Sequence, residues 1–138
     1  TMSDLIDKMN IALGWELRAS NMYAHYAANI KGIHRLQLSP MFNTEMTESI
    51  DHADIVRKAI VQLGGIPVTE RNPHPIIHTN DYLEMLNYSL ETEIKAAEVY
   101  AELIELIEDT DEEDLRDAIE QIYLSELRSV EEMRLLVG

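Results

Sequence analysis

Residues 13–23 read LGWELRASNMY, and residues 90–100 repeat this pattern as LETEIKAAEVY, 77 positions further along the chain. Identical residue pairs at this offset include Asn10/Asn87, Leu13/Leu90, Glu16/Glu93, Ala19/Ala96 and Tyr23/Tyr100. A repeat of this kind indicates that one structural unit is used twice. The chain is therefore expected to fold as two related halves.

Glu16 and Glu93 lie inside apolar stretches, where a carboxylate is unexpected. Leu, Ala and Tyr recur around both glutamates at the three- and four-residue spacing of a single helix face. An ionised carboxylate is unfavourable in such a place unless it is paired, protonated or bound to a metal. The two glutamates are therefore the first candidates for a functional role.

The composition limits the class of protein. The 138 residues suffice for one domain with its own core, expected over residues 1–138. Because there is no cysteine, disulfides, zinc–thiolate sites, iron–sulfur clusters and thiol catalysis are excluded. We see no apolar run that resembles a membrane span or a signal peptide, so we expect a cytoplasmic location and no membrane partner. The formal charge of −15 argues against nucleic-acid binding and makes cations the natural partners.

The apolar periodicity predicts four helices and no strand. We expect them over residues 3–31, 39–64, 80–109 and 110–138, with Pro40 in a first helical turn and a capping box at Thr110 and Glu113. Residues 66–79 contain three prolines and no helical period, which predicts a long crossover. The predicted fold is an all-α, antiparallel four-helix bundle with the crossover between its second and third helices and no fifth helix, the topology of ferritin-like folds.

In ferritin-like di-iron proteins, two helices each provide one Glu and the other two each provide a Glu-x-x-His motif. Both motifs are incomplete in this chain. The repeat offset aligns Ser49-x-x-His52 with Glu126-x-x-Ser129. Each helix thus keeps one half of the motif, and the missing halves are complementary.

The order and spacing of Glu16, Tyr23, His52, Glu93 and Glu126 resemble bacterioferritin over almost the whole chain, and more loosely the DNA-protecting mini-ferritins. The resemblance implies that Glu16 and Glu93 are terminal ligands of two metals. It implies that His52 is the imidazole ligand of the first metal and that Glu126 bridges both. Tyr23 then corresponds to the catalytic tyrosine beside the centre.

Two serines distinguish this chain from that pattern. Ser49 stands where the resemblance places the second bridging glutamate, and Ser129 where it places the second histidine. The second metal position would therefore keep only Glu93 and a share of Glu126. Glu48, four residues before His52 on the same helix face, is the predicted replacement for the carboxylate missing at Ser49.

Carboxylate and imidazole ligands select iron, or manganese, over softer metals. The leading hypothesis is an iron-binding protein with ferroxidase and iron-sequestering activity. It would bind one or two ions per chain, use dioxygen or peroxide as oxidant, and assemble as a homo-oligomer, either a dimer or a larger shell. No haem is expected, because Ile50 occupies the position of the haem-ligating methionine of bacterioferritins.

Two other functions compete with this hypothesis. One is a catalytically inactive ferritin-like module with a structural or interaction role, in which His52 pairs with buried carboxyls that keep their protons. The other is a rubrerythrin-like peroxide reductase, which the lack of a cysteine-ligated iron disfavours.

Overall fold

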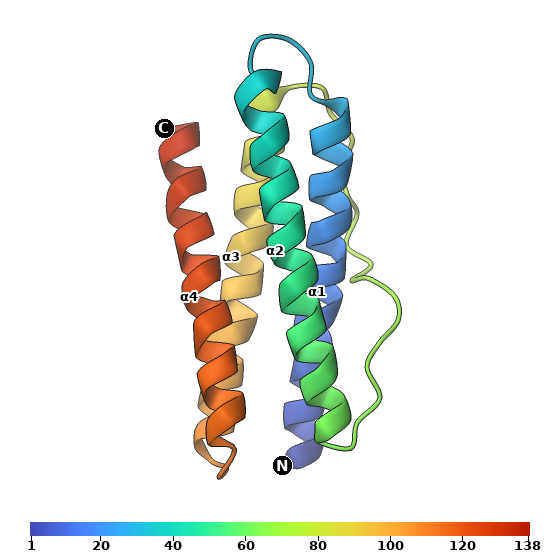
Figure 1. The fold of residues 1–138 in the computed structure, drawn as a ribbon, viewed down its shortest axis with the longest axis vertical. Coiled ribbons are helices and arrows are strands. Elements are labelled where there is room, and N and C mark those ends of the chain that lie inside the picture. The colour runs from blue at the N-terminus through green and yellow to red at the C-terminus, as the bar shows by residue number, and fades with distance from the viewer.

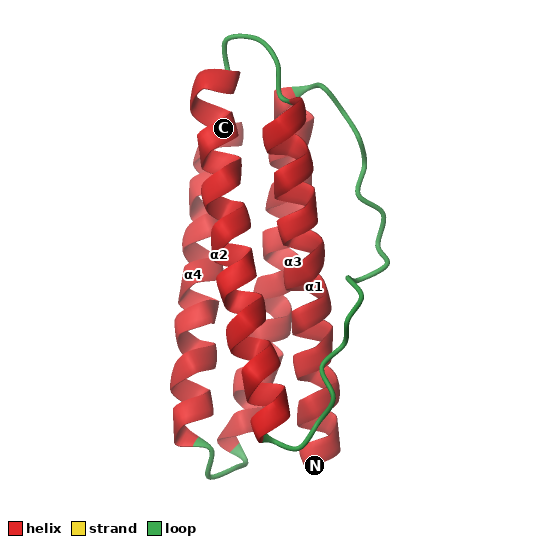
Figure 2. Cartoon of the chain, turned by 45° about the vertical axis from the view of Figure 1, so that its right-hand side comes forward, coloured by secondary structure: helices red, strands yellow, loops and turns green.

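The computed structural model describes residues 1–138 as four long α-helices without a strand. The helices are α1 (Met2–Asn29), α2 (Arg35–Gln62), α3 (Tyr82–Glu108) and α4 (Glu113–Val137). Two antiparallel hairpins, α1–α2 and α3–α4, lie side by side, and residues 63–81 run back along the outside of α1 before α3 begins (Figures 1 and 2). The predicted four-helix bundle with its long crossover is confirmed. None of the helices combines the length and apolar character needed to cross a membrane.

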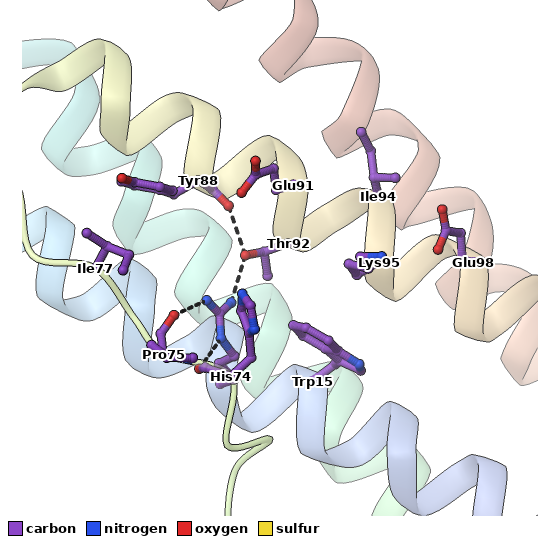
Figure 3. A pocket seen from close by; sticks show the side chains of 11 residues that line it. Trp15, His74, Pro75, Ile77, Tyr88, Glu91, Thr92, Ile94, Lys95 and Glu98 are labelled. Atoms are coloured by element: carbon purple, nitrogen blue, oxygen red, sulfur yellow. Dashed lines mark hydrogen bonds between the residues drawn. The ribbon is translucent and has the colours of Figure 1, made fainter.

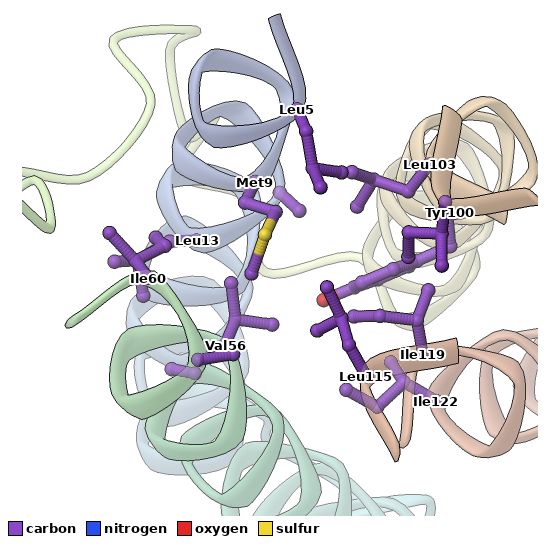
Figure 4. Packing of buried hydrophobic residues seen from close by; sticks show 14 of the residues in the cluster. Leu5, Met9, Leu13, Val56, Ile60, Tyr100, Leu103, Leu115, Ile119 and Ile122 are labelled. Atoms are coloured by element: carbon purple, nitrogen blue, oxygen red, sulfur yellow. The ribbon is translucent and has the colours of Figure 1, made fainter. Parts of the chain in front are cut away.

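Two separate apolar clusters fill the bundle. One lies toward the start of α1 and includes Leu5, Met9, Leu13, Val56 and Ile60, which face Tyr100, Leu103 and Ile119 (Figure 4). The other lies toward the opposite end and contains the aromatic residues Tyr23, Tyr26 and Phe42 together with Met22, Met85 and Met133. Every one of these side chains is almost completely buried.

A layer of buried polar side chains separates the two clusters. On each helix the polar positions fall between the residues that join one cluster and those that join the other. This layer contains Glu16 on α1, Ser49 and the partly buried His52 on α2, Glu93 on α3, and Glu126 and Ser129 on α4. Polar residues therefore replace apolar ones on the inner face of each helix at the same level of the bundle. This places the candidate ligands together.

The start of α2 differs from the prediction. The helix begins at Arg35, and Pro40 lies inside it rather than in its first turn. Two residues in this first part of α2 form hydrogen bonds with the end of α1. Arg35 donates from Nη1 to the carbonyls of Ala28 at 3.1 Å and Ile30 at 2.7 Å, and the Ser39 hydroxyl donates to the carbonyl of Ala27 at 2.9 Å. These bonds satisfy carbonyls that the end of a helix leaves without partners.

The starts of α1 and α4 also differ from the prediction. α1 begins at Met2, one residue before the predicted start, and Thr1 caps it in a capping box with Asp4. At the start of α4, Glu112 is the cap residue and makes no side-chain cap bond. The Thr110 hydroxyl instead donates to the Ile107 carbonyl at 2.7 Å, at the end of α3. Thr110 therefore belongs to the turn between the two helices.

The crossover is fastened to α1 along its length. The amide of Asn72 donates to the carbonyl of Gly14 at 2.9 Å, and a Cβ on Gly14 would lie only 3.4 Å from that amide nitrogen. The buried Arg18 donates to the carbonyls of His74 and Pro75, each at 2.9 Å. Further along, Nε2 of His25 lies 2.8 Å from Nδ1 of His78. The two crossover histidines, His74 and His78, are exposed.

Candidate metal centre

Glu16, His52 and Glu126 meet in the middle of the bundle. Nδ1 of His52 lies 3.1 Å from Oε2 of Glu16 and 3.1 Å from Oε1 of Glu126. One ligand atom from each of the three residues falls within 4.8 Å of the others. The two carboxyl side chains are almost completely buried, whereas 13% of the His52 side chain is exposed. Three helices therefore bring two oxygen donors and one nitrogen donor to one small volume.

Two tyrosines connect the repeated halves across this centre. The hydroxyl of Tyr23, on α1, donates to Oε1 of Glu93, on α3, at 2.5 Å. The hydroxyl of Tyr100, on α3, donates to Oε2 of Glu16, on α1, at 2.8 Å. Each repeat thus supplies the tyrosine that holds the glutamate of the other repeat. Tyr100 was not among the predicted site residues, although the repeat that pairs it with Tyr23 indicated its role.

The charges in the centre depend on one another. Burial would lower the pKa of His52, but hydrogen bonds to Glu126 and Glu16 and their negative charges raise it to about 10. Burial raises the pKa of Glu126 to about 7, and the charge of Glu16 contributes to this rise. Burial, the charge of Glu126 and a hydrogen bond with Glu126 raise the pKa of Glu93 well above its usual value. At neutral pH His52 is therefore an imidazolium, and burial beside Glu126 favours the uncharged form of Glu93.

Glu16 belongs to the same hydrogen-bond network, through His52. Burial raises its pKa, while the hydrogen bond from His52 opposes this effect. No buried side-chain nitrogen or oxygen lacks a hydrogen-bond partner. The metal-free centre is thus a satisfied network, in which positive charge on His52 offsets the carboxylates around it.

A second group of polar residues lies between α2 and α4. The hydroxyl of Ser129 donates to Oε2 of Glu45 at 3.0 Å. Both residues line a cavity of about 150 Å³ with Glu48, and the remaining lining residues are Ser125, Arg128 and Glu132. Burial raises the pKa of Glu45 to about 7, and the charges of Glu93 and Glu48 add to the rise. Glu45 is therefore close enough to the buried centre to respond to it.

The predicted site residues fall into two sets. Glu16, His52 and Glu126 form one compact group, and Glu93 joins it through Glu126. Tyr23 contacts the centre through its hydrogen bond to Glu93. Glu48 lies further out, half-buried in the wall of the cavity between α2 and α4. The contact between Glu45 and Ser129 was not predicted, although Glu45 precedes Ser49 by one helical turn and shares its face.

A larger cavity lies away from this centre. It has a volume of about 610 Å³ and lies under the crossover, between Trp15 on α1 and Tyr88 and Lys95 on α3 (Figure 3). Its buried cation, Arg18, is saturated by two crossover carbonyls and by the Thr92 hydroxyl at 2.8 Å. Arg18 therefore fastens the crossover to α1 beside this cavity.

We expect both reciprocal tyrosines to contribute to the stability of the protein. Tyr23→Phe and Tyr100→Phe should each lower the free energy of unfolding by about 1–3 kcal/mol, because each removes a donor to a buried carboxyl oxygen. The loss should be smaller for Tyr100→Phe, because Oε2 of Glu16 also lies 3.1 Å from Nδ1 of His52. Urea unfolding of the metal-free protein measures this. Tyr123→Phe is the control, because that ring lies half-buried in the groove between α3 and α4. A loss no larger than that of the control would show that the two bonds do not hold the glutamates.

The fold and the centre together define a class: four-helix bundles with carboxylates and an imidazole gathered in a buried middle layer. The profile of the ferritin-like domain matches residues 6–138, and the chain belongs to this family. A crystal structure of ferritin-like, diiron-carboxylate proteins from Bacillus anthracis strain Ames superposes with a TM-score of 0.94 at 29% identity, covering 99% of this chain and 97% of that one. No curated protein matches the chain.

Proposed function

We propose that this protein binds ferrous iron in the middle of its bundle and oxidises it, with sequestration of the product. The observation that carries the proposal is the group of Glu16, His52 and Glu126, whose ligand atoms lie within 4.8 Å of one another. Two hard oxygen donors and an imidazole are the donor set that iron and manganese prefer. The neighbouring structure from Bacillus anthracis is described as a diiron-carboxylate protein, which supports iron.

The residues present fit an ion at this position. Nδ1 of His52 is the nitrogen that faces both carboxylates, so loss of its proton would turn a lone pair toward the space between them. Glu126 also bonds to Glu93 and is therefore placed to serve two positions. We assign Tyr23 the catalytic position, because its hydroxyl touches Glu93, a proposed ligand.

Iron is the substrate in this proposal. Two ferrous ions lose one electron each, and one dioxygen takes both electrons with two protons to become hydrogen peroxide. The chain's own residues bind the ions, exclude bulk water with the two apolar clusters, and accept or release protons at His52 and Glu93. A peroxide oxidant would take the same two electrons and yield water.

Anaerobic titration with ferrous ion tests the proposal. We expect one tight site per chain, formed by Glu16, His52 and Glu126, and a weaker second site that includes Glu93. Calorimetry gives the stoichiometry, and admission of air followed at the ferric absorbance gives the oxidation. Absence of any tight site would reject the iron function.

One observation favours a different function. No buried side-chain nitrogen or oxygen lacks a hydrogen-bond partner, so the polar groups of the buried layer can pair among themselves. A catalytically inactive module with a structural or interaction role would have this property. The two functions differ in the titration above, because the inactive module would bind no ferrous ion tightly.

We further propose that the protein self-associates through the outer face of α1 and α2. A shallow depression of about 450 Å³ there is lined by four hydrophobic residues, Leu17, Ala24, Met46 and Ile50, and by four polar ones, Ser20, Asn21, Thr69 and Arg71. About half of Ile50 is exposed. Light scattering at micromolar concentration is expected to give at least a dimer, and Ile50→Glu is expected to weaken it by placing a charge in the apolar contact. A monomeric unaltered protein would contradict this.

Because Ile50 offers no axial ligand, no haem absorbance is expected after expression with haem in excess.

A further inference from the structure

Ser49 and Ser129 leave the second metal position with two carboxylates, from Glu93 and Glu126. Two dications in a dry space need about four negative charges, and three buried glutamates provide at most three. A further carboxylate must therefore be available nearby if two ions are to bind. Both Glu45 and Glu48 lie close enough along α2 to be considered.

The structure distinguishes these two glutamates. Glu45 precedes Ser49 by four residues, so it lies one turn above the missing ligand on the same face of α2. Its Oε2 accepts a hydrogen bond of 3.0 Å from Ser129, the residue at the other missing ligand position. Glu48 has no bond of this kind to the layer of buried polar residues. The carboxylate of Glu45 thus contacts Ser129, which stands where the second histidine is missing. It also lies one helical turn from Ser49, which stands where the second bridging glutamate is missing.

The space around Glu45 is suited to an ion and its water. The cavity between α2 and α4 has a volume of about 150 Å³, and all six residues that line it are polar or charged. The closest packing in the bundle lies within the α1–α2 and α3–α4 hairpins, whereas α2 and α4 barely touch. Ser129 lines this space with its small side chain, and a histidine at that position would extend into it. A cation can therefore approach from the side where Glu45 lies.

We propose that Glu45 supplies the missing carboxylate of the second metal position, completing with Glu93 and Glu126 a site for a divalent cation such as ferrous or manganous ion. This inference rests on the proposed iron-binding function. Ser129 is a positioning residue, which holds the carboxylate toward the centre without touching the ion. With Glu45 included, four carboxylates surround the two positions and match the charge of two dications. The lack of a second imidazole makes this position weaker than the first.

Calorimetric titration with cobaltous ion tests this inference without any oxidation. The unaltered protein is expected to bind two ions per chain with unequal affinities. Glu45→Gln should keep the tight site and weaken the second at least about tenfold, and Ser129→Ala should weaken the second by a smaller factor. Asp51→Asn, on the exposed face of α2, is the charge-matched control and should bind both ions as before. Visible absorption of bound cobalt reports the coordination of each site independently of activity.

The outcomes separate this inference from the proposed function. Equal binding of two ions by the unaltered protein and by Glu45→Gln would overturn the assignment of Glu45. Loss of the second ion in Glu48→Gln alone would give the role to Glu48. Binding of only one ion per chain by the unaltered protein, with no second ion at any affinity, would overturn the inference and leave the proposed function standing, whereas no binding at all would reject both. Circular dichroism checks that each variant folds, and Glu45→Asp, which keeps the charge but has a shorter reach, should also weaken the second site.

Discussion

Glu126→Gln is expected to abolish tight binding of both metals, the largest effect of any single substitution in this chain. Glu126 is the one side chain that contacts His52 at the first position and Glu93 at the second. An amide cannot bridge two cations, so its affinity for each should fall by about a hundredfold or more. Anaerobic titration with ferrous ion measures both affinities, and oxygen-dependent oxidation should fall in parallel.

Glu131→Gln provides the matched control for this substitution. Glu131 is an exposed residue of α4, and its replacement removes the same charge without touching the centre. Loss of only one metal in Glu126→Gln would show that this glutamate does not bridge. Retention of both metals would mean that the buried layer is not the binding site.

Metal binding is expected to strengthen by about tenfold for each unit of pH above pH 7. His52, with a pKa of about 10, carries a proton at neutral pH on the nitrogen that faces the centre, and the ion must displace it. The dependence should become steeper below pH 7, because Glu126, with a pKa of about 7, then also gains a proton. Calorimetry in two buffers of different ionisation enthalpy counts the protons released. An affinity independent of pH, with no proton release, would contradict the assignment of His52.

The stability of the metal-free protein should change in the opposite direction. The folded-state pKa of His52 lies above its unfolded value of 6.5, so its contribution is complete below about pH 6.5 and is lost as pH rises through about 10. The raised pKa of Glu93 acts in the same sense, because the folded state again holds more protons than the unfolded state. Between pH 7 and 9 the free energy of unfolding should fall by on the order of 2 kcal/mol. Urea unfolding at several pH values measures this, and a rise in stability over the same range would refute it.

The sequence was sufficient for the architecture because the helical period, the prolines of the crossover and the 77-residue repeat all agree. It was also sufficient to bring Glu16, His52 and Glu126 together, since each lies on the inner face of its helix. The start of α2 was missed because Pro40 normally marks a first turn. Here Arg35 and Ser39 bond to the end of α1, a tertiary contact that local propensity does not reveal.

The second metal position shows a different limit of sequence reasoning. Glu45 and Glu48 are three residues apart, so helical spacing alone allows either to face inward. The choice depends on what each side chain meets across the gap between α2 and α4. Glu45 meets the hydroxyl of Ser129, a residue 84 positions away, and only the assembled bundle contains that contact.

The crossed tyrosine bonds bear on how such a chain can arise. Tyr23 serves the glutamate of the second hairpin and Tyr100 that of the first, so neither hairpin completes its own half of the centre. An ancestor made of one hairpin would have needed a second copy of itself, and any substitution would then have appeared on both sides of the symmetry axis. Ser49 and Ser129 each change one half only. Such one-sided differences are open to a chain whose two hairpins are fused, because each half can then be substituted independently of the other.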